Sequence, residues 1–420
     1  MIWLSALFKV LVATQPWLAF IIVFVFDIPR DTLSFVITGF DRFLRRFEQR
    51  QILDDADISV VIPTLNNPSG LLTALYALDK QTIRPSQVIA IDDGSSDETG
   101  AVLAYARANG LIDVAIFNDR RMGVSGACNK ALLFVKCPYV LFLDCDTELA
   151  PTALAELVTR MEVTGAAAIS GNIGIRNEGA SLWTSIQQIE YMIAIDFGRS
   201  FLDRFNAIAC CSGAMTLFDA AALRKIGGFN AGSGQDLDVT LRLREAGHRI
   251  SFASRAWALT DGPETFAGLA KQRLRWDRDA IRIHIFQHHQ LRKASNRESL
   301  GNTIQRYDFI NFTLFPTLLL PFFFWGLFQV PGSLLPDFLL AAYLLMLGVA
   351  AVNLGVIYAA YRGAVRPFHL FLLPFFPLYQ GILMKAVRLY AFLSETIWRA
   401  SKSDGFIPAR VRAQLYKDER

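Results

Sequence analysis

Two aspartates that follow a short apolar run are the residues from which chemistry can first be argued. Residues 139 to 143 read Tyr-Val-Leu-Phe-Leu, and Asp144, Cys145 and Asp146 follow. An unbroken apolar run of this length is typical of a strand buried on both faces of a mostly parallel sheet. Because side chains alternate along an extended chain, Asp144 and Asp146 are predicted to point to the same side. Two carboxylates at the carboxyl end of a core strand suit Mg²⁺ or Mn²⁺ bound to the phosphates of a nucleotide, and an acidic turn after a strand is the alternative.

A second acidic pair, Asp92 and Asp93, comes directly after another apolar run. Ser95 and Glu98 have the spacing of a capping box for the next helix, which explains part of this segment but not the two aspartates. Adjacent carboxylates at the end of a strand are costly unless something pairs with them, and a base N–H or ribose hydroxyls would do so. We expect them to hold a nucleoside, with a capped turn as the alternative. Thr64, near the end of the first strand, adds a polar group at the same edge of the sheet.

Two further motifs lie towards the end of this region. Asp236 is at or near the start of a helix that runs to Gly247, where the helix dipole and free N–H groups favour an ionised carboxylate. An aspartate that only caps the helix is the alternative, but an ionised carboxylate in a cleft also suits a general base for a sugar hydroxyl. Residues 272 to 276 read Gln-Arg-Leu-Arg-Trp. Arg275 can bind diphosphate oxygens as a fork, and Trp276 offers a flat face to a sugar ring, although any basic amphipathic helix near a membrane could carry this pattern.

The segment that must position these residues runs from 57 to 262. Short apolar runs alternate there with helical stretches, which predicts βαβ units and an α/β domain with a parallel sheet. We expect strands at residues 58–62, 87–91, 114–117 and 139–143, and helices at residues 70–79 and 97–109.

Composition excludes several classes of protein. The chain has 420 residues, of which 53% are hydrophobic and 33 are Phe, so it is longer than one usual domain and more apolar than most soluble proteins. Its net charge of +4 implies no strong attraction to nucleic acid, and no nucleic-acid partner is expected. Five cysteines without a Cys-x-x-Cys spacing predict neither a zinc site nor a disulfide framework. His284 and His288 share a helical face, but no acidic partner is in register, so a metal site is not expected there.

The termini have the composition of membrane segments. Residues 10–26 are nearly all apolar, so we expect residues 1–28 to form a transmembrane segment rather than a cleaved signal peptide. Residues 29–56 mix arginines with apolar residues, as in an amphipathic linker on the cytoplasmic membrane surface. Residues 263–306 read as interfacial helices.

The C-terminal membrane region is expected at residues 307–398. Phe309 to Val330 and Phe338 to Tyr361 are each long enough to span. Residues 367–398 are interrupted by prolines and basic residues, so a third span and a re-entrant or interfacial segment both stay open. The basic tail at residues 399–420 favours a cytosolic end. Together these segments predict a multi-pass inner-membrane protein with a cytosolic catalytic domain.

The motifs, taken in order, resemble those of the processive membrane glycosyltransferases of family 2, which include cellulose, chitin, hyaluronan and poly-N-acetylglucosamine synthases. The series is Asp-Asp-Gly-Ser, Asp-x-Asp, a single Asp and Gln-x-x-Arg-Trp, and the resemblance covers roughly residues 57–276. It implies a GT-A (Rossmann-like) fold, a nucleotide-diphosphate sugar donor, a divalent metal, Mg²⁺ or Mn²⁺, and inversion at the anomeric carbon.

The resemblance also implies a role for each motif residue. Asp236 would be the general base, and Asp144 and Asp146 would bind the metal. The other expected contacts are to the donor through Thr64, Asp92, Asp93, Asp144 and Arg275, and to the acceptor through Gln272 and Trp276.

Two residues depart from the pattern of the family. Gln235 precedes the expected base where relatives commonly have an acidic residue, which removes one neighbouring charge. Val124 stands where many members have Lys, so a diphosphate contact is expected from Arg120 or Arg121 instead.

The resemblance predicts a processive inverting β-glycosyltransferase that polymerises an exopolysaccharide from UDP-glucose or UDP-N-acetylglucosamine, coupled to translocation across the membrane. Its expected partners are the nucleotide-sugar donor, the growing polysaccharide acceptor, the lipid bilayer and accessory membrane or periplasmic subunits. The alternatives are an enzyme that transfers one sugar to a lipid carrier, and an inactive subunit of a synthase complex.

Overall fold

An eight-stranded mixed sheet organises the part of the chain that the computed structural model describes, which is residues 20, 28–44, 53, 56–288, 300–360, 369–405 and 407–412. The strand order is β3-β2-β1-β4-β7-β6-β8-β5. The strands are β1 (Ile58–Thr64), β2 (Gln87–Asp92), β3 (Val114–Phe117), β4 (Tyr139–Leu143), β5 (Glu148–Leu149), β6 (Ala168–Ile175), β7 (Met215–Asp219) and β8 (Ile250–Thr260).

The sheet is mixed, and parallel pairs occur in both halves, including β6 with β8. β1 pairs with β2 and β4, and β2 with β3, all in parallel. β7 then inserts antiparallel between β4 and β6, with Leu143 opposite Met215, and β5 pairs antiparallel with β8, so the sheet contains antiparallel strands that the sequence did not predict. The insertion brings the loop before β7 to the carboxyl end of β4, because the two strands run in opposite directions.

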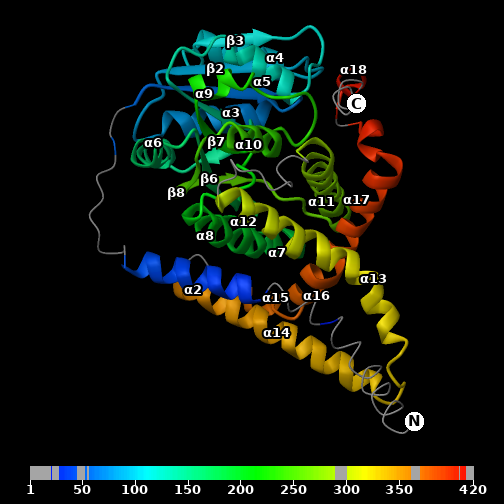
Figure 1. The fold of residues 1–420 in the computed structure, drawn as a ribbon. Coiled ribbons are helices and arrows are strands. Elements are labelled where there is room, and N and C mark those ends of the chain that lie inside the picture. Colours follow the sequence, from blue (N-terminus) through cyan, green and yellow to red (C-terminus); the bar gives the residue numbers. More distant parts are fainter. Residues whose placement is uncertain are drawn as a thin grey trace.

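Helices cover both faces of the sheet, and alternation along the strands decides which residue faces which layer. Val60 and Ile62 of β1 pack in one core cluster, whereas Val61 packs in the other. The first cluster includes residues of α3 (Pro68–Asp79), α4 (Thr99–Ala108) and α6 (Ala153–Thr164), and the second includes residues of α5 (Val124–Leu132), α9 (Ala220–Lys225) and α10 (Gln235–Glu245). Figure 1 shows the sheet between these layers.

The start of α4 differs from the prediction. The helix begins at Thr99, and Glu98 at its N-cap position makes no side-chain capping bond. Ser95 Oγ instead accepts a hydrogen bond from the backbone N–H of Asn66, at 2.9 Å. The predicted capping box was therefore wrong, because the Ser95 hydroxyl joins the loops that follow β1 and β2.

A helical layer lies along one side of the sheet domain (Figure 1), and its first three helices are inserted in sequence between β6 and β7. Its first part comprises α7 (Leu182–Tyr191), η3 (Met192–Gly198), α8 (Arg199–Arg204), α11 (Phe266–Ile281) and η4 (Arg282–Gln287). The C-terminal part comprises α12 (Leu300–Asp308), η6 (Phe309–Leu314), α13 (Phe315–Leu327), α14 (Leu335–Ala360), α15 (His369–Leu372), α16 (Phe376–Leu378), η7 (Tyr379–Met384), α17 (Lys385–Trp398), η8 (Ala400–Ser403) and α18 (Ala409–Arg412).

Two helical segments within the described residues, Leu300–Leu327 and Leu335–Val356, are long and apolar enough to cross a membrane. The amphipathic α2 (Ile28–Leu44) packs against α14. The predicted N-terminal span lies outside the described residues except for Phe20, whose ring centroid is 6.2 Å from that of Phe323.

The last helices return to the sheet domain. α17 packs along α11, and Arg410 of α18 donates hydrogen bonds to the backbone carbonyls of Arg120 and Arg121 at 3.2 and 2.5 Å. The described part of the tail therefore packs against the sheet domain.

Candidate active site

The Asp-Cys-Asp segment forms a turn rather than the end of a strand. β4 ends at Leu143, and Thr147 N–H closes the turn on the carbonyl of Asp144 at 3.0 Å. The strand-alternation argument therefore does not apply to Asp144 and Asp146, yet their carboxylates still interact. Burial, and then the negative charge of Asp146, raise the pKa of Asp144 to about 8. Cys145 points to a different partner, since Asn67 Nδ2 donates to its Sγ at 3.6 Å.

Asp236 lies in the first turn of α10, not at its cap. The N-cap residue is Gly234, with φ of +70°, and an added Cβ there would lie 2.9 Å from Cβ of Asp279. This excludes the capping alternative. The backbone N–H of Leu237 donates to Asp236 Oδ1 at 2.9 Å. Burial nevertheless raises the pKa of Asp236, against the expectation that the helix start keeps it readily ionised. A carboxylate with a raised pKa is a stronger base.

The catalytic candidates converge from separate elements. Asp144, after β4, and Asp236, on α10, line the same small cavity together with Gly213 from the loop before β7. The charge of Asp236 contributes to the raised pKa of Asp144, and Arg275 of α11 counteracts it. The structure thus brings together Asp144, Asp146, Asp236 and Arg275, as the sequence motifs predict.

The three expected nucleoside residues also lie together, but the two carboxylates have protein partners. Asp92 Oδ1 accepts from the backbone N–H of Ser95 at 2.9 Å. Asp93 N–H donates to the carbonyl of Thr64 at 2.9 Å, which joins the ends of β1 and β2. Asp92, Asp93 and Thr64 are all buried.

The Asp93 carboxylate organises the loop between β3 and α5. Its Oδ1 accepts from Asn118 Nδ2 at 2.9 Å and from Met122 N–H at 2.7 Å, and its Oδ2 accepts from Gly123 N–H at 2.7 Å. These donors offset the cost of burying the charge. A carboxylate has about four acceptor positions, so three protein bonds leave room for one more donor.

On α11 the acceptor candidates are held by an ion pair that sequence reasoning missed. Arg273 donates to Glu190 Oε2 at 2.9 Å, and the Tyr379 hydroxyl donates to the same oxygen at 2.7 Å. The Arg273 guanidinium also lies 4.4 Å from the centre of the Trp276 ring, which is 39% exposed. Gln272 Oε1 is buried and has no hydrogen-bond partner among the described residues. The Gln-x-x-Glu-Tyr run at residues 187–191 is the sequence signal for this ion pair.

A second missed group flanks Asp146. Arg176, at the end of β6, pairs with Asp261 through two hydrogen bonds of 2.9 and 2.5 Å and lies 3.9 Å from Glu148. Burial and the charge of Asp261 raise the pKa of Asp146, and Arg176 opposes this. These residues are far apart in sequence and carry no motif, so only the sheet topology reveals them.

Comparisons with known proteins agree with this geometry. Residues 59–227 match the family model "Glycosyl transferase family 2". Residues 59–227 are therefore similar to a family 2 glycosyltransferase domain, and this matched segment is called the family 2 domain below. The chain is 27% identical over 239 residues to an "N-acetylglucosaminyltransferase" of Azorhizobium caulinodans, a match that covers 54% of this chain and 60% of the relative. It is 30% identical over 225 residues to a "Poly-beta-1,6-N-acetyl-D-glucosamine synthase" of Staphylococcus epidermidis, covering 52% of this chain and 53% of the relative.

A solved structure confirms the fold of the family 2 domain. It is the mannosyltransferase PcManGT from Pyrobaculum calidifontis in complex with GDP-Man and Mn²⁺, with a TM-score of 0.58 and 16% identity, covering 92% of this chain and 99% of that one. The predicted α/β GT-A fold is confirmed. The chain spans a little over half the length of the curated relatives it matches.

The matched segment of the family 2 domain contains only part of the site. Thr64, the two acidic pairs and their loops lie within residues 59–227, whereas Asp236 and Arg275 lie beyond it. α10 and α11 carry these two residues back to the carboxyl end of β4, which is why their charges act on Asp144.

Proposed function

We propose that the protein is an inverting glycosyltransferase that adds N-acetylglucosamine from UDP-N-acetylglucosamine to the growing end of a polysaccharide. The observation that supports the reaction most strongly is the convergence of Asp144, Asp146, Asp236 and Arg275 around the end of β4. The choice of sugar is supported by the printed names of the relatives, and UDP-glucose is the competing donor.

A divalent cation fits the acidic pair. Asp144 and Asp146 offer only oxygen ligands, which suit Mg²⁺ or Mn²⁺. Burial raises the pKa of both carboxyls, with a further contribution from Asp146 to Asp144 and from Asp261 to Asp146, so a cation would favour their ionised forms. When bound, it would neutralise charge that develops on the leaving diphosphate. No group of three or more His, Cys, Asp or Glu that could hold a metal occurs in the described residues.

The side chains of the protein supply the rest of the reaction. Asp236 removes the proton from the acceptor hydroxyl, and that oxygen attacks the anomeric carbon as the bond to the diphosphate breaks. One displacement inverts the configuration and needs no covalent enzyme intermediate. Arg275 pairs with the diphosphate as a fork. Gln272 and Trp276 bind the acceptor end, with the unpartnered Gln272 Oε1 available to a sugar hydroxyl.

The position of the proposed acceptor residues supports repeated addition and export. α11 carries both Arg275 and Trp276 and packs along α17, next to the helices that could cross a membrane. A product that leaves the site along this helix would be delivered towards the bilayer and kept available for another addition. We therefore include processive synthesis and translocation in the proposal, with accessory membrane or periplasmic subunits as partners.

The experiment uses the full chain in lipid nanodiscs with Mg²⁺ or Mn²⁺. Nucleotide release is measured with UDP-N-acetylglucosamine, UDP-glucose, UDP-glucuronate and GDP-mannose, and products are sized. The proposal predicts release with UDP-N-acetylglucosamine and a high-mass product. A product extended by one sugar would identify a single-transfer enzyme, and no turnover with any donor would favour an inactive subunit.

A further inference from the structure

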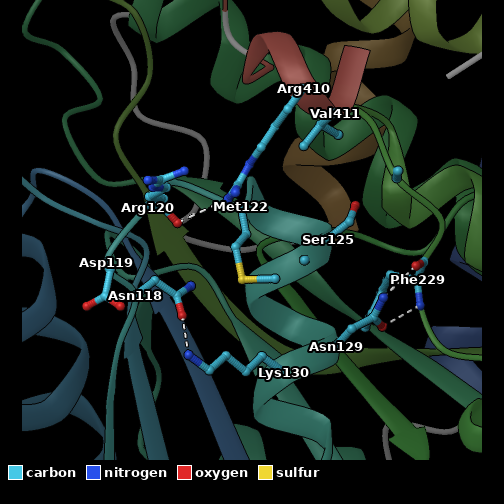
Figure 2. Close-up of a pocket in the computed structure, with 12 residues that line it drawn as sticks. Asn118, Asp119, Arg120, Met122, Ser125, Asn129, Lys130, Phe229, Arg410 and Val411 are labelled. Atoms are coloured by element: carbon cyan, nitrogen blue, oxygen red, sulfur yellow. Dashed lines mark hydrogen bonds between the residues drawn. The ribbon is translucent and has the colours of Figure 1, made fainter. Parts of the chain in front are cut away.

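A second cavity, of about 590 Å³, lies between the catalytic domain and the C-terminal tail. Figure 2 shows its walls: the loop after β3 with Arg120, the helix α5 with Asn129 and Lys130, and the tail with Arg410 and Val411. Cavities of this size hold small molecules in other proteins.

This cavity is separate from the active site because α5 stands between them. Gly126, Asn129 and Lys130 line the tail cavity, whereas Val124 and Cys128 line the cavity that contains Asp144 and Asp236. At about 100° per residue, the two sets point to opposite sides of the helix. The tail cavity is therefore distinct from the cavity that contains Asp144 and Asp236, although Phe229 lines both, and Arg120, one of the two expected donor-diphosphate contacts, lies on the tail side.

The lining of the tail cavity favours an anion. The lining contains three cationic residues, Arg120, Lys130 and Arg410, and one acidic residue, Asp119. Arginine forks and lysine ammonium groups are the usual partners of phosphate. Asn129 makes two hydrogen bonds with the backbone of Phe229, at 2.7 and 2.8 Å, so this wall is already fixed before a ligand arrives.

The position of the cavity favours a soluble ligand over a lipid headgroup. α18 lies beside the upper part of the sheet domain, near β3 and α5, at the end of the molecule away from α13 and α14 (Figure 1). The two candidate spans include most of α13 and α14. A headgroup held in the bilayer would have to reach past the helical layer to contact Arg410.

A short chain of hydrogen bonds connects the tail cavity to the nucleoside end of the active site. Lys130 Nζ donates to Asn118 Oδ1 at 2.6 Å, and Asn118 Nδ2 donates to Asp93 Oδ1 at 2.9 Å. Arg410 holds the backbone of the same loop through the carbonyls of Arg120 and Arg121. A ligand that engages these cations therefore acts on the loop whose N–H groups hold Asp93.

We propose that a soluble phosphate-bearing small molecule binds in the tail cavity between Arg120, Lys130 and Arg410 and orders the loop at residues 118–123. Binding changes donor affinity through Asn118 and Asp93, and only this last step rests on the proposed function. The binding itself can be measured without any sugar transfer.

The test titrates the full chain in detergent with inorganic pyrophosphate in a calorimeter, without divalent metal. One binding event is expected, and Arg410→Ala should weaken it about tenfold or more, since one charge-assisted contact is lost. Lys130→Met should weaken it similarly. Arg412→Ala, on the same short helix but outside the cavity lining, should bind like the wild type, and so should Arg275→Met, which removes the contact proposed for the donor diphosphate.

Amide hydrogen exchange supplies a readout that is independent of activity. Pyrophosphate should slow exchange across residues 118–123 in the wild type but not in Arg410→Ala. Unaltered binding in Arg410→Ala and Lys130→Met, or loss in Arg275→Met, would overturn the assignment to this cavity. Equal, Arg410-dependent binding to phosphatidic acid vesicles would overturn the choice of a soluble ligand. Failure of sugar transfer with intact pyrophosphate binding would count only against the proposed function.

Discussion

The ion pair between Arg273 and Glu190 is expected to hold the acceptor side of the site in place. The two side chains are 12% and 17% exposed, and their closest N–O distance is 2.9 Å. Arg273→Met leaves the Glu190 carboxylate with the Tyr379 hydroxyl, and it removes the cation that lies 4.4 Å from the Trp276 ring.

The size of the effect follows from burial. Breaking a buried ion pair by removing one partner costs about 3–5 kcal/mol. We take about 3 kcal/mol, since Tyr379 still donates to Glu190. For a domain of this size, about 2–4 °C per kcal/mol gives a fall of about 6–12 °C in the midpoint of thermal unfolding.

The assay is a double-mutant cycle in nanodiscs with Arg273→Met, Glu190→Gln and the double variant, with the exposed Lys271→Met as the matched control on the same helix. The double variant should be more stable than the sum of the two single losses predicts, because it leaves no charge unpaired. Strictly additive losses, or an Arg273→Met midpoint equal to that of Lys271→Met, would refute the reasoning.

Three further predictions concern pH, metal and acceptor. Burial alone would lower the pKa of His288, but hydrogen bonds to Asp238 and Glu245 raise it to about 9 from 6.5. The stabilisation by His288 should therefore be full below about pH 6.5 and lost as pH rises through about 9. Thermal unfolding of His288→Gln should depend less on pH in this window than that of the wild type, and an identical profile would contradict the assignment. Asp146→Asn should abolish the Mn²⁺-dependent part of donor binding in calorimetry, whereas equal donor affinity with and without Mn²⁺ in the wild type would remove Asp146 from a metal site. Trp276→Ala should shorten the products on a sizing column while Trp276→Phe largely keeps their length, and unchanged products from the Ala variant would exclude sugar stacking on this ring.

The first half of the fold could be predicted from sequence because its signals are local. The strands β1 to β4 are short apolar runs, and each ends in polar residues that follow directly in the chain. The motifs around Asp93 and Asp144 could be placed at one edge of the sheet because parallel strands share a carboxyl end, whereas Asp236 was joined to them only through the family resemblance.

The rest depended on contacts between distant segments. No local pattern distinguishes β7, which runs antiparallel, from a further parallel strand. The pKa of Asp236 rises because the folded chain buries its carboxyl, and this effect outweighs the lowering of the pKa that its position at a helix start predicts. His288 seemed to have no acidic partner along its own helix, whereas its partners Asp238 and Glu245 are both on α10.

The role of Asp236 as general base is the central claim, and Asp236→Asn tests it most directly. Donor binding by calorimetry and sugar transfer by nucleotide release are measured on the same nanodisc sample, with the exposed Glu98→Gln as control for loss of one carboxylate. The account predicts transfer reduced by about 10²–10⁴-fold, with donor affinity close to that of the wild type. Transfer that continues at the rate of Glu98→Gln would contradict it.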